Sequence, residues 1–500
     1  MRPFMTLARG ALLIAAGFAS SACNADPVTL NIIAGSEVRD LEPILTQMKS
    51  DIGVELKLTY SGTLDGVERV RGGEVFDAAW FSHGKYLKLV APTKVLQEER
   101  IMLSPVVMGV KRSTVERLGW RGKSVTWGDI ADASAAGKLR YAMTNPSASN
   151  SGFTALMGVN AALGSSNERL KGFFKGQTLT AGSSGWLAES FTRDFAKLDG
   201  MINYESVLLS LKNLPEPLEL IYPKEGIVTA DYPLTLLSAD KREVYQKVVD
   251  YLRLPKTQER IMTETLRRPA NPDVAVSSVF PQALLVELPF PQTAPEVSAI
   301  LGKYLSDQRR AVHSVFVLDI SGSMDGERFE ALKNSLRRLA GDDTSLSGQA
   351  ATFQKREQVT VVTFSGTVSA PETLLIQSAT ERQTFRDRVD ALRLGNGTAI
   401  YDGLNAAYTY LAKTVPLEPD KSHSVVLMTD GENNAGDNLA AFEAKFAALP
   451  GAAKSVKLFP ILFGEANNGE MERLAELTGG RVFDGRKSLE AAFKEIRGYQ

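Results

Sequence analysis

The sequence has little of what nucleophilic active sites are made from. Its 500 residues include one cysteine and three histidines. A single cysteine excludes an intramolecular disulfide, so stability must come from hydrophobic cores and bound metal. The histidines, His83, His313 and His423, fall in different predicted elements without metal-ligand spacing. Because the chain also lacks a G-x-S-x-G nucleophile elbow and a Walker-type phosphate loop, we predict that it is not an enzyme and has no catalytic residues.

Net charge is nearly absent as well. The chain carries 57 basic and 58 acidic residues, which gives a net charge of −1. Without an extended basic field, the composition gives no support for binding to nucleic acid. At roughly 100 to 200 residues per domain, the length favours about three compact units.

Long hydrophobic runs are missing except near the N-terminus. Arg2 and Arg9 flank the start of an apolar run from Ala11 to Phe18, a pattern typical of an export signal. The run is too short to span a bilayer, which needs about 20 apolar residues. Cys23 follows directly and resembles the acylation site of a bacterial lipoprotein.

This N-terminal pattern predicts an exported protein of the cell envelope, on the outer face of the membrane or in the periplasm. We expect lipidation of Cys23, although Ser20 stands where such sites usually have leucine. Contact with the membrane would then be made only through that lipid anchor. Ordinary cleavage after a small residue is the alternative.

Oxygen-bearing side chains follow three predicted strand ends in the C-terminal part. Asp319, Ser321 and Ser323 come after the apolar strand Val315 to Leu318, and Thr398 and Asp430 follow in later loops. In a parallel α/β sheet, such loops meet at the carboxyl ends of the strands. Mg²⁺ takes about six oxygens at roughly 2.0 to 2.1 Å, and carboxylates and hydroxyls suit it. We therefore predict a divalent cation site, for Mg²⁺ or else Mn²⁺ or Ca²⁺, with one position open to a ligand carboxylate.

Residues from about 311 to 496 resemble a von Willebrand factor type A domain with a complete metal-ion-dependent adhesion site. The motifs that carry the likeness are Asp319-x-Ser321-x-Ser323, Gly397-Thr398-Ala399-Ile400-Tyr401 and Thr429-Asp430-Gly431. The resemblance implies a Rossmann-like, doubly wound sheet. It also implies hydroxyl ligands from Ser321, Ser323 and Thr398, with Asp319 and Asp430 binding directly or through water. Its implied partner is a protein that offers an acidic side chain to the metal.

The region from Val28 to about Asn271 alternates short strands with helices, and its loops are rich in Ser, Thr, Asn and Gly. Helix N-termini present free backbone N–H groups, so such loops can hold a small anion without a cationic side chain. Each loop alone is an ordinary cap or turn. Five of them in one region favour a shared cleft. No Lys or Arg lies inside these loops, and Arg39 is the nearest in sequence.

This region resembles a bacterial extracellular solute-binding protein of the type that serves ABC transporters, most like members that capture oxyanions. The likeness rests on Gly35-Ser36, Tyr60 to Asp65, Asn145 to Gly152 and Asn203-Tyr204-Glu205. It implies a two-lobed, type 2 architecture, an ABC permease as a partner, and a ligand that is an oxyanion or a neutral polar solute. The implied cleft residues are Ser36, Ser61, Thr63, Ser147, Ser151, Ser184 and Tyr204.

The expected organisation is α/β throughout. It comprises a signal at 1–23, a solute-binding domain at 24–278 with lobe I at about 28–105 and 225–278 and lobe II at about 106–224, a proline-rich linker with a short helix at 279–310, and a von Willebrand factor type A domain at 311–500. The function this favours is a binding protein that holds a solute in one half and a protein partner through Mg²⁺ in the other. Two alternatives remain open: a metal-dependent assembly or chaperone subunit, and an adhesin whose solute-binding half is a ligand-free scaffold.

Overall fold

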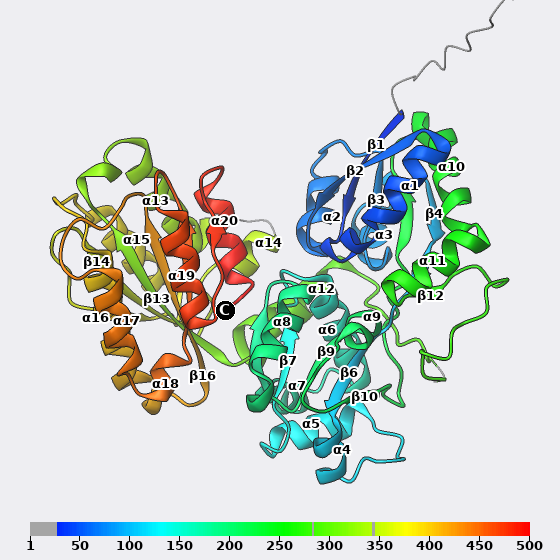
Figure 1. Ribbon diagram of the computed structural model, residues 1–500, viewed down its shortest axis with the longest axis horizontal. Coiled ribbons are helices and arrows are strands. Elements are labelled where there is room, and N and C mark those ends of the chain that lie inside the picture. The colour runs from blue at the N-terminus through cyan, green and yellow to red at the C-terminus, as the bar shows by residue number, and fades with distance from the viewer. Residues whose placement is uncertain (1–27, 283–284, 343–345) are drawn as a thin grey trace, which may run out of the picture.

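The computed structural model describes residues 28–282, 285–342 and 346–500 (Figure 1). The predicted export signal, Cys23 and two residues of the predicted linker, 283 and 284, lie outside the described residues. Within the described ranges, no helix has the length and apolar character needed to cross a membrane.

Lobe I is built on a five-stranded sheet with the order β2-β1-β3-β11-β4. The first three strands are parallel, and β11 runs antiparallel to both of its neighbours. The strands are β1 (Val28–Ala34), β2 (Val54–Tyr60), β3 (Ala78–Trp80), β4 (Gln97–Arg100) and β11 (Pro233–Leu236). The helices of this lobe are α1 (Glu42–Ile52), α2 (Thr63–Arg71), α3 (Lys85–Val90), α10 (Arg242–Arg253) and α11 (Pro255–Thr265).

Lobe II contains a second five-stranded sheet with the order β10-β6-β9-β7-β8. Every residue of β6, β7 and β9 is buried, as expected where helices cover both faces of a sheet. The strands are β6 (Val106–Lys111), β7 (Tyr141–Thr144), β8 (Gln177–Ala181), β9 (Gly200–Tyr204) and β10 (Leu218–Ile221). The helices are α4 (Arg112–Arg117), α5 (Trp127–Ala135), α6 (Asn150–Ala162), α7 (Asn167–Lys175), α8 (Ser184–Arg193) and α9 (Glu205–Ser210). A short pair, β5 (Met102–Leu103) with β12 (Arg268–Pro269), lies where the chain passes between the lobes.

The C-terminal domain has a six-stranded sheet with the order β15-β14-β13-β16-β17-β18, in which only β15 is antiparallel. The strands are β13 (Ala311–Asp319), β14 (Gln358–Phe364), β15 (Glu372–Leu375), β16 (Lys421–Thr429), β17 (Lys457–Leu462) and β18 (Phe483–Asp484). The helices are α13 (Glu327–Arg337), α14 (Leu346–Ala351), α15 (Ala379–Ala391), α16 (Ile400–Thr414), α17 (Leu439–Ala447), α18 (Gly451–Lys454), α19 (Asn468–Thr478) and α20 (Leu489–Arg497). The α/β, doubly wound class predicted from sequence is confirmed.

The strand order of this sheet fixes where a ligand site can form. The chain begins in the middle at β13, adds β14 on one side, and later adds β16 on the other. The order of the strands therefore reverses between β13 and β16, and such a switch point leaves a crevice at the carboxyl ends of its strands.

The register of β13 and β16 corrects the prediction that the histidines lie apart from one another. His313 and His423, which have no metal-ligand spacing along the chain, are direct partners on β13 and β16. Parallel pairing brings residues more than a hundred positions apart into contact, and sequence spacing does not reveal it.

Helix α12 (Ala294–Lys303) joins the two halves and matches the short amphipathic helix expected after the prolines. The Thr293 hydroxyl caps its N-terminus, and Pro295 occupies the first turn, where its missing N–H costs nothing. Its buried residues are Val297 and Leu301. The helix contacts α6 of lobe II and α14 of the C-terminal domain.

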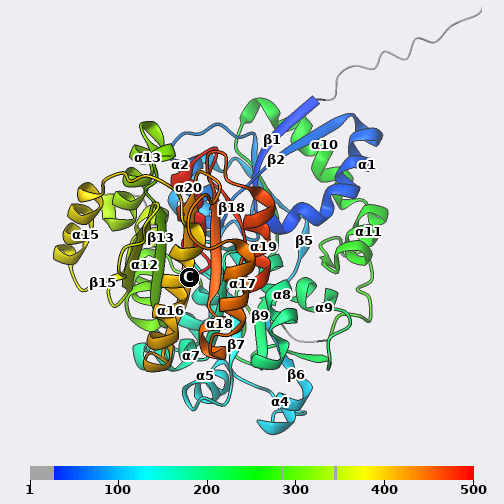
Figure 2. The ribbon, with the colours of Figure 1, turned by 60° about the vertical axis from the view of Figure 1, so that its left-hand side comes forward.

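The C-terminal domain packs directly on the two-lobed region (Figures 1 and 2). One continuous hydrophobic cluster runs from lobe I residues such as Ile33 to Phe316 and Phe493 of the C-terminal domain. Helix α14 contacts α2 of lobe I. The halves are therefore one packed body in this structure.

Candidate functional site

The first candidate site lies at the switch point between β13 and β16, and we call it the metal-edge cluster: Asp319, Ser321, Ser323, Thr429 and Asp430. The Asp319 carboxylate accepts from the Ser321 N–H at 2.8 Å and from the Thr429 hydroxyl at 2.6 Å. The Ser321 and Ser323 hydroxyl oxygens are 3.0 Å apart, and Ser323 donates to the Asp430 carboxylate at 2.8 Å. Four of the five predicted ligands are thus joined in one hydrogen-bonded group.

The fifth predicted ligand, Thr398, is held beside the cluster by its backbone. The Gly395 N–H donates to the carbonyl of Ile320 at 2.7 Å, which fixes the middle loop against the first one. The Thr398 N–H donates to the Asn434 side chain at 2.8 Å. The side chain of Thr398 is buried, yet no hydrogen bond among the described residues joins its hydroxyl to the cluster. Gly397, with φ of +77°, supplies the backbone turn that the loop requires.

The electrostatics of the cluster favour a cation. Asp319 and Asp430 are 0% and 1% exposed. Burial raises the pKa of Asp319, and the nearby Asp430 carboxylate raises it further, while hydrogen bonds from Ser321 and Thr429 oppose the shift. A donor set of carboxylates and hydroxyls without nitrogen or sulfur fits Mg²⁺.

Two residues of this site were not predicted from sequence as members of it. Thr429 donates to Asp319, and its place directly before Asp430 in the third motif was the available signal. Arg328 lies in the first turn of α13 and donates to Asp430 at 2.8 Å. No local pattern distinguishes Arg328 from an ordinary helix-surface cation, because its role depends on the folded position of Asp430.

The second candidate site is a cavity of about 1260 Å³ between the lobes, which we call the interlobe cavity. Four of the seven predicted cleft residues line it: Ser36, Ser61, Ser147 and Ser184. Arg39 also lines the cavity, and its guanidinium stacks on the ring of Tyr60 at 4.5 Å. Among the described residues, no carboxylate pairs with Arg39.

The other three predicted residues, Thr63, Ser151 and Tyr204, are buried and do not line the cavity. Thr63 bonds to Asn150, and Ser151 bonds to Ser184 at 2.7 Å. Tyr204 donates to the Glu37 carboxylate at 3.2 Å. These hydroxyls support the wall rather than face the interior.

Several hydroxyls that line the cavity already donate to the protein itself. Ser61 donates to Asp65 at 2.9 Å, and Ser147 donates to Asn145 at 2.8 Å. Glu37, which sequence reasoning missed, extends from lobe I and accepts from Asn150 and Tyr204 of lobe II. Burial raises the pKa of Glu37, and the Asn150 hydrogen bond opposes the shift. Protein groups thus satisfy part of the polar surface between the lobes.

The C-terminal domain supplies a third wall of this cavity. Lys494 of α20 pairs with Asp65 of α2 at 3.0 Å, and the Asn145 side chain donates to the Arg497 carbonyl at 3.2 Å. The ring of Tyr499 packs so closely on Gly182 that no Cβ would fit there. One wall of the cavity is therefore supplied by α20, which begins 285 residues after Tyr204, the last predicted cleft residue.

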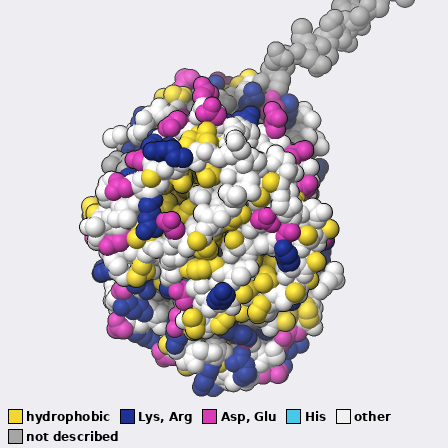
Figure 3. All heavy atoms as spheres, turned by 90° about the vertical axis from the view of Figure 1, so that its left-hand side faces the viewer, with side chains coloured by type: hydrophobic (Ala, Val, Ile, Leu, Met, Phe, Trp, Pro, Cys, Tyr) yellow, Lys and Arg dark blue, Asp and Glu magenta, His cyan; other side chains and the backbone are white. Residues whose placement is uncertain are grey.

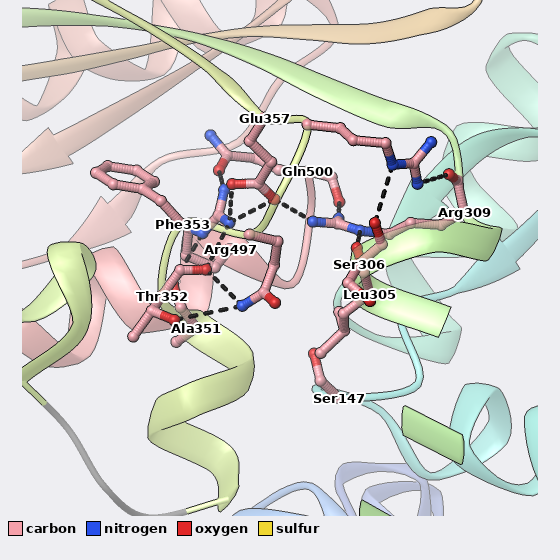
Figure 4. A network of polar contacts seen from close by, with 12 residues as sticks. Ser147, Leu305, Ser306, Arg309, Ala351, Thr352, Phe353, Glu357, Arg497 and Gln500 are labelled. Atoms are coloured by element: carbon pink, nitrogen blue, oxygen red, sulfur yellow. Dashed lines mark hydrogen bonds and ion pairs between the residues drawn. The ribbon is translucent and has the colours of Figure 1, made fainter. Parts of the chain in front are cut away.

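A buried ion cluster holds this third wall in place (Figure 4). The Glu357 carboxylate accepts from Arg309 and, at 2.6 Å, from Arg497 at the end of α20. The side chains of all three residues are at most 7% exposed. Arg497 also donates to the Thr352 carbonyl at 3.1 Å. The carboxylate and the extra acceptors satisfy the two buried guanidinium groups.

Comparison with protein families gives one match for each half. Residues 30–264 match the model of the bacterial extracellular solute-binding protein, and residues 315–496 match the von Willebrand factor type A domain. Inter-alpha-trypsin inhibitor heavy chain H3 of Homo sapiens is 34% identical over 127 residues, which are 25% of this chain and 13% of that protein. An uncharacterized protein, sll0103, of Synechocystis sp. is 29% identical over 136 residues, 26% of this chain and 28% of that protein. The chain thus matches less than a third of the length of either curated relative.

Among solved structures, similarity is found for each half. The periplasmic binding protein AfuA from Actinobacillus pleuropneumoniae, solved with fructose-6-phosphate, has a TM-score of 0.45 and 15% identity, covering 56% of this chain and 98% of that one. A von Willebrand factor type A protein from Catenulispora acidiphila has a TM-score of 0.31 and 18% identity, covering 38% of this chain and 43% of that one. From the family comparison, residues 30–264 of this chain are similar to a bacterial extracellular solute-binding protein and residues 315–496 to a von Willebrand factor type A domain.

Proposed function

We propose that the protein is an exported, lipid-anchored binding protein with two binding sites and no catalytic activity. One site is the interlobe cavity, which takes a small anionic or polar solute. The other is the metal-edge cluster, which holds Mg²⁺ and through it the carboxylate of a protein partner.

The observation that carries this proposal is the convergence of two buried carboxylates and two serine hydroxyls at the switch point of the sheet. Asp319, Ser321, Ser323, Thr398 and Asp430 would hold the ion. When bound, Mg²⁺ would supply a Lewis acid for an incoming carboxylate. Arg328 would hold Asp430 in position from its second oxygen.

The exposure of the cluster supports access by a macromolecule. Ser323 is exposed, whereas Asp319 and Asp430 are buried beneath it, so the donors open to solvent on one side. Acidic and basic side chains are intermixed on the outer face of the C-terminal domain (Figure 3). Long-range electrostatic attraction would therefore contribute little to binding of the protein partner. Its specificity would depend on the metal ion and on the residues around the metal-edge cluster.

Arg39 favours an anion over a neutral solute in the interlobe cavity. Charged side chains of both signs line the cavity, but among the described residues no carboxylate pairs with Arg39, so its charge stays available to an anion. The hydroxyls of Ser61 and Ser147 already donate to Asp65 and Asn145. A guanidinium can bind an oxyanion through two parallel N–H groups. An ABC permease would be the natural recipient of such a solute.

The test of partner binding compares matched variants of the full chain. Envelope proteins retained by the immobilised protein in Mg²⁺ should be released by EDTA and should not bind Asp319→Ala. The control is Asp325→Ala, an exposed carboxylate six residues along the same loop. Equal retention by both variants, or retention that EDTA does not reverse, would contradict metal-dependent binding of the partner.

The test of solute binding is mass spectrometry of co-purifying small molecules, followed by calorimetric titration with sulfate, phosphate, molybdate and small sugars. We expect heat from one or more of the anions. Two observations favour a second candidate, a ligand-free scaffold: hydroxyls of the cavity already donate to Asp65 and Asn145, and the C-terminal domain forms one of the cavity walls. If none of these compounds gives heat of binding, the ligand-free scaffold would replace the solute-binding proposal.

A further inference from the structure

A second group of potential metal ligands lies far from the metal-edge cluster, near the other end of β13. His313 and His423 are register partners, and Glu418 lies just before β16. At about 3.3 Å per residue, the six positions from His313 to Asp319 correspond to roughly 20 Å. The ligand atoms of His313, Glu418 and His423 all lie within 4.8 Å of one another.

The three side chains converge on one carboxylate oxygen. Glu418 Oε2 is 2.9 Å from His313 Nδ1 and 3.1 Å from His423 Nε2. Ligands of a tetrahedral zinc ion at about 2.0 to 2.1 Å are themselves about 3.4 Å apart. A small side-chain rotation would therefore admit an ion. Two imidazoles and one carboxylate also leave the fourth tetrahedral position open.

Surrounding residues hold these groups in the orientation that ligation needs. His313 Nε2 lies 2.8 Å from the Thr360 hydroxyl, which lies 2.8 Å from that of Thr373. This contact directs Nδ1 of the ring toward Glu418, as outer partners of metal-binding histidines do. Lys421 donates to the other oxygen of Glu418 at 2.7 Å, so that Oε2 faces the imidazoles.

An ion could reach the group through a cavity of about 390 Å³ between the C-terminal domain and lobe II. His423 lines it, together with Arg310, Lys421 and Lys457. These cationic side chains disfavour a weakly held hard ion such as Mg²⁺. A borderline ion that bonds strongly to imidazole can overcome that repulsion.

We propose that His313, Glu418 and His423 form a binding site for a transition-metal ion such as Zn²⁺, separate from the metal-edge cluster. The ion would join the start of β13 to the segment that leads into β16. Its open position would face the cavity beside lobe II. The Lys421 ammonium orients Glu418 but lowers the affinity by its charge.

The test uses the full chain, freed of transition metals and held in saturating Mg²⁺. It is titrated with Zn²⁺, and separately with Co²⁺ as a spectroscopic probe. We expect one Zn²⁺ per chain, a visible Co²⁺ absorption band, and a rise in melting temperature with Zn²⁺. Glu418→Gln and His423→Gln should each weaken binding by at least about tenfold, the lower bound for losing even an outer-shell partner. Lys421→Met should strengthen it, because a nearby positive charge is removed.

Asp319→Ala is the control that separates the two metal sites, and it should bind Zn²⁺ as the wild type does. Near-ultraviolet circular dichroism shows which variants keep the native fold. Absence of stoichiometric Zn²⁺ binding by the wild type would overturn the proposal. So would equal affinity in folded His423→Gln, or loss of binding in Asp319→Ala.

Discussion

The metal-edge cluster and the interlobe cavity are built in opposite ways. The cluster comes from loops at one edge of one sheet, and its groups contact each other directly. The cavity has walls from lobe I, lobe II and the C-terminal domain, and the pair Lys494–Asp65 joins residues 429 positions apart. The first site therefore depends on one domain alone, whereas the second depends on how lobe I, lobe II and the C-terminal domain pack on one another.

The third wall of the cavity can be loosened at Glu357, which holds Arg497 of α20 within the C-terminal domain. Glu357→Gln removes the carboxylate charge that two buried guanidinium groups share, and breaking a buried pair costs about 3–5 kcal/mol. We expect a loss of that size in the free energy of unfolding, measured with urea. Glu490→Gln, which removes a half-exposed partner of Arg338, is the control and should cost under about 1 kcal/mol. Similar losses in both variants would refute the anchoring role of Glu357.

Lobe I should lose stability in acid, because it contains a buried neutral histidine, His83. Burial lowers the pKa of His83 to about 3 from the usual 6.5, and neither ring nitrogen has a hydrogen-bond partner among the described residues. The unfolded chain binds this proton at a higher pH, so the contribution to stability is full above about 6.5 and is lost as pH falls toward 3.

His83→Phe should remove that dependence. Phe153 and Phe290 already pack on the ring with centroids at 5.9 and 5.4 Å. Between pH 6 and 4, the free energy of unfolding of the wild type should fall more steeply than that of the variant, by up to about 1.4 kcal/mol per pH unit. Urea unfolding at several pH values measures both slopes, and equal slopes would contradict the assignment.

Arg39 distinguishes the two sites, because it lines the interlobe cavity and is not part of the metal-edge cluster. Arg39→Gln should weaken binding of the anion identified by titration by about 10- to 100-fold, the value of a charge-assisted hydrogen bond of about 1.5–3 kcal/mol. Mg²⁺ binding should be unchanged. Lys57→Gln, an exposed cation on the neighbouring strand β2, should affect neither. If both substitutions weaken anion binding equally, the overall charge of the protein, and not a specific site at Arg39, would explain the affinity.

The smallest effect on stability is expected for the exposed ion pair between Lys494 and Asp65 in the wall of the interlobe cavity. Lys494→Gln breaks the ion pair with Asp65, but the two side chains are 33% and 42% exposed. Such pairs contribute under about 1 kcal/mol. The change in the free energy of unfolding should stay below that value, because the apolar packing of Tyr499 remains. A larger loss would show that charge, and not packing, holds the third wall.

Features with a local sequence pattern could be predicted, whereas features that depend on how the lobes and domains pack together could not. The alternation of strands and helices predicted the α/β class, and both family resemblances are confirmed. The motif Asp319-x-Ser321-x-Ser323 placed three oxygens in one turn, so their proximity follows from spacing alone. Ser151 and Tyr204 carried the same kind of local signal, yet they are buried behind the cavity wall.

The features that were missed depend on tertiary contacts. Arg328 meets Asp430, Glu37 meets Asn150, and His313 meets His423 only after strands and lobes are assembled. The contribution of α20 to the cavity wall likewise has no signature in the sequence of lobe I or lobe II. Whether hydroxyls donate to a ligand or to a neighbouring carboxylate is decided by such contacts.

The most direct test of the central claim is calorimetric titration of Mg²⁺ into the metal-free full chain and into Asp430→Asn. We expect one Mg²⁺ per chain in the wild type, with the heat lost in Asp430→Asn and kept in Asp325→Ala. No binding by the wild type, or the same heat from Asp430→Asn, would contradict it.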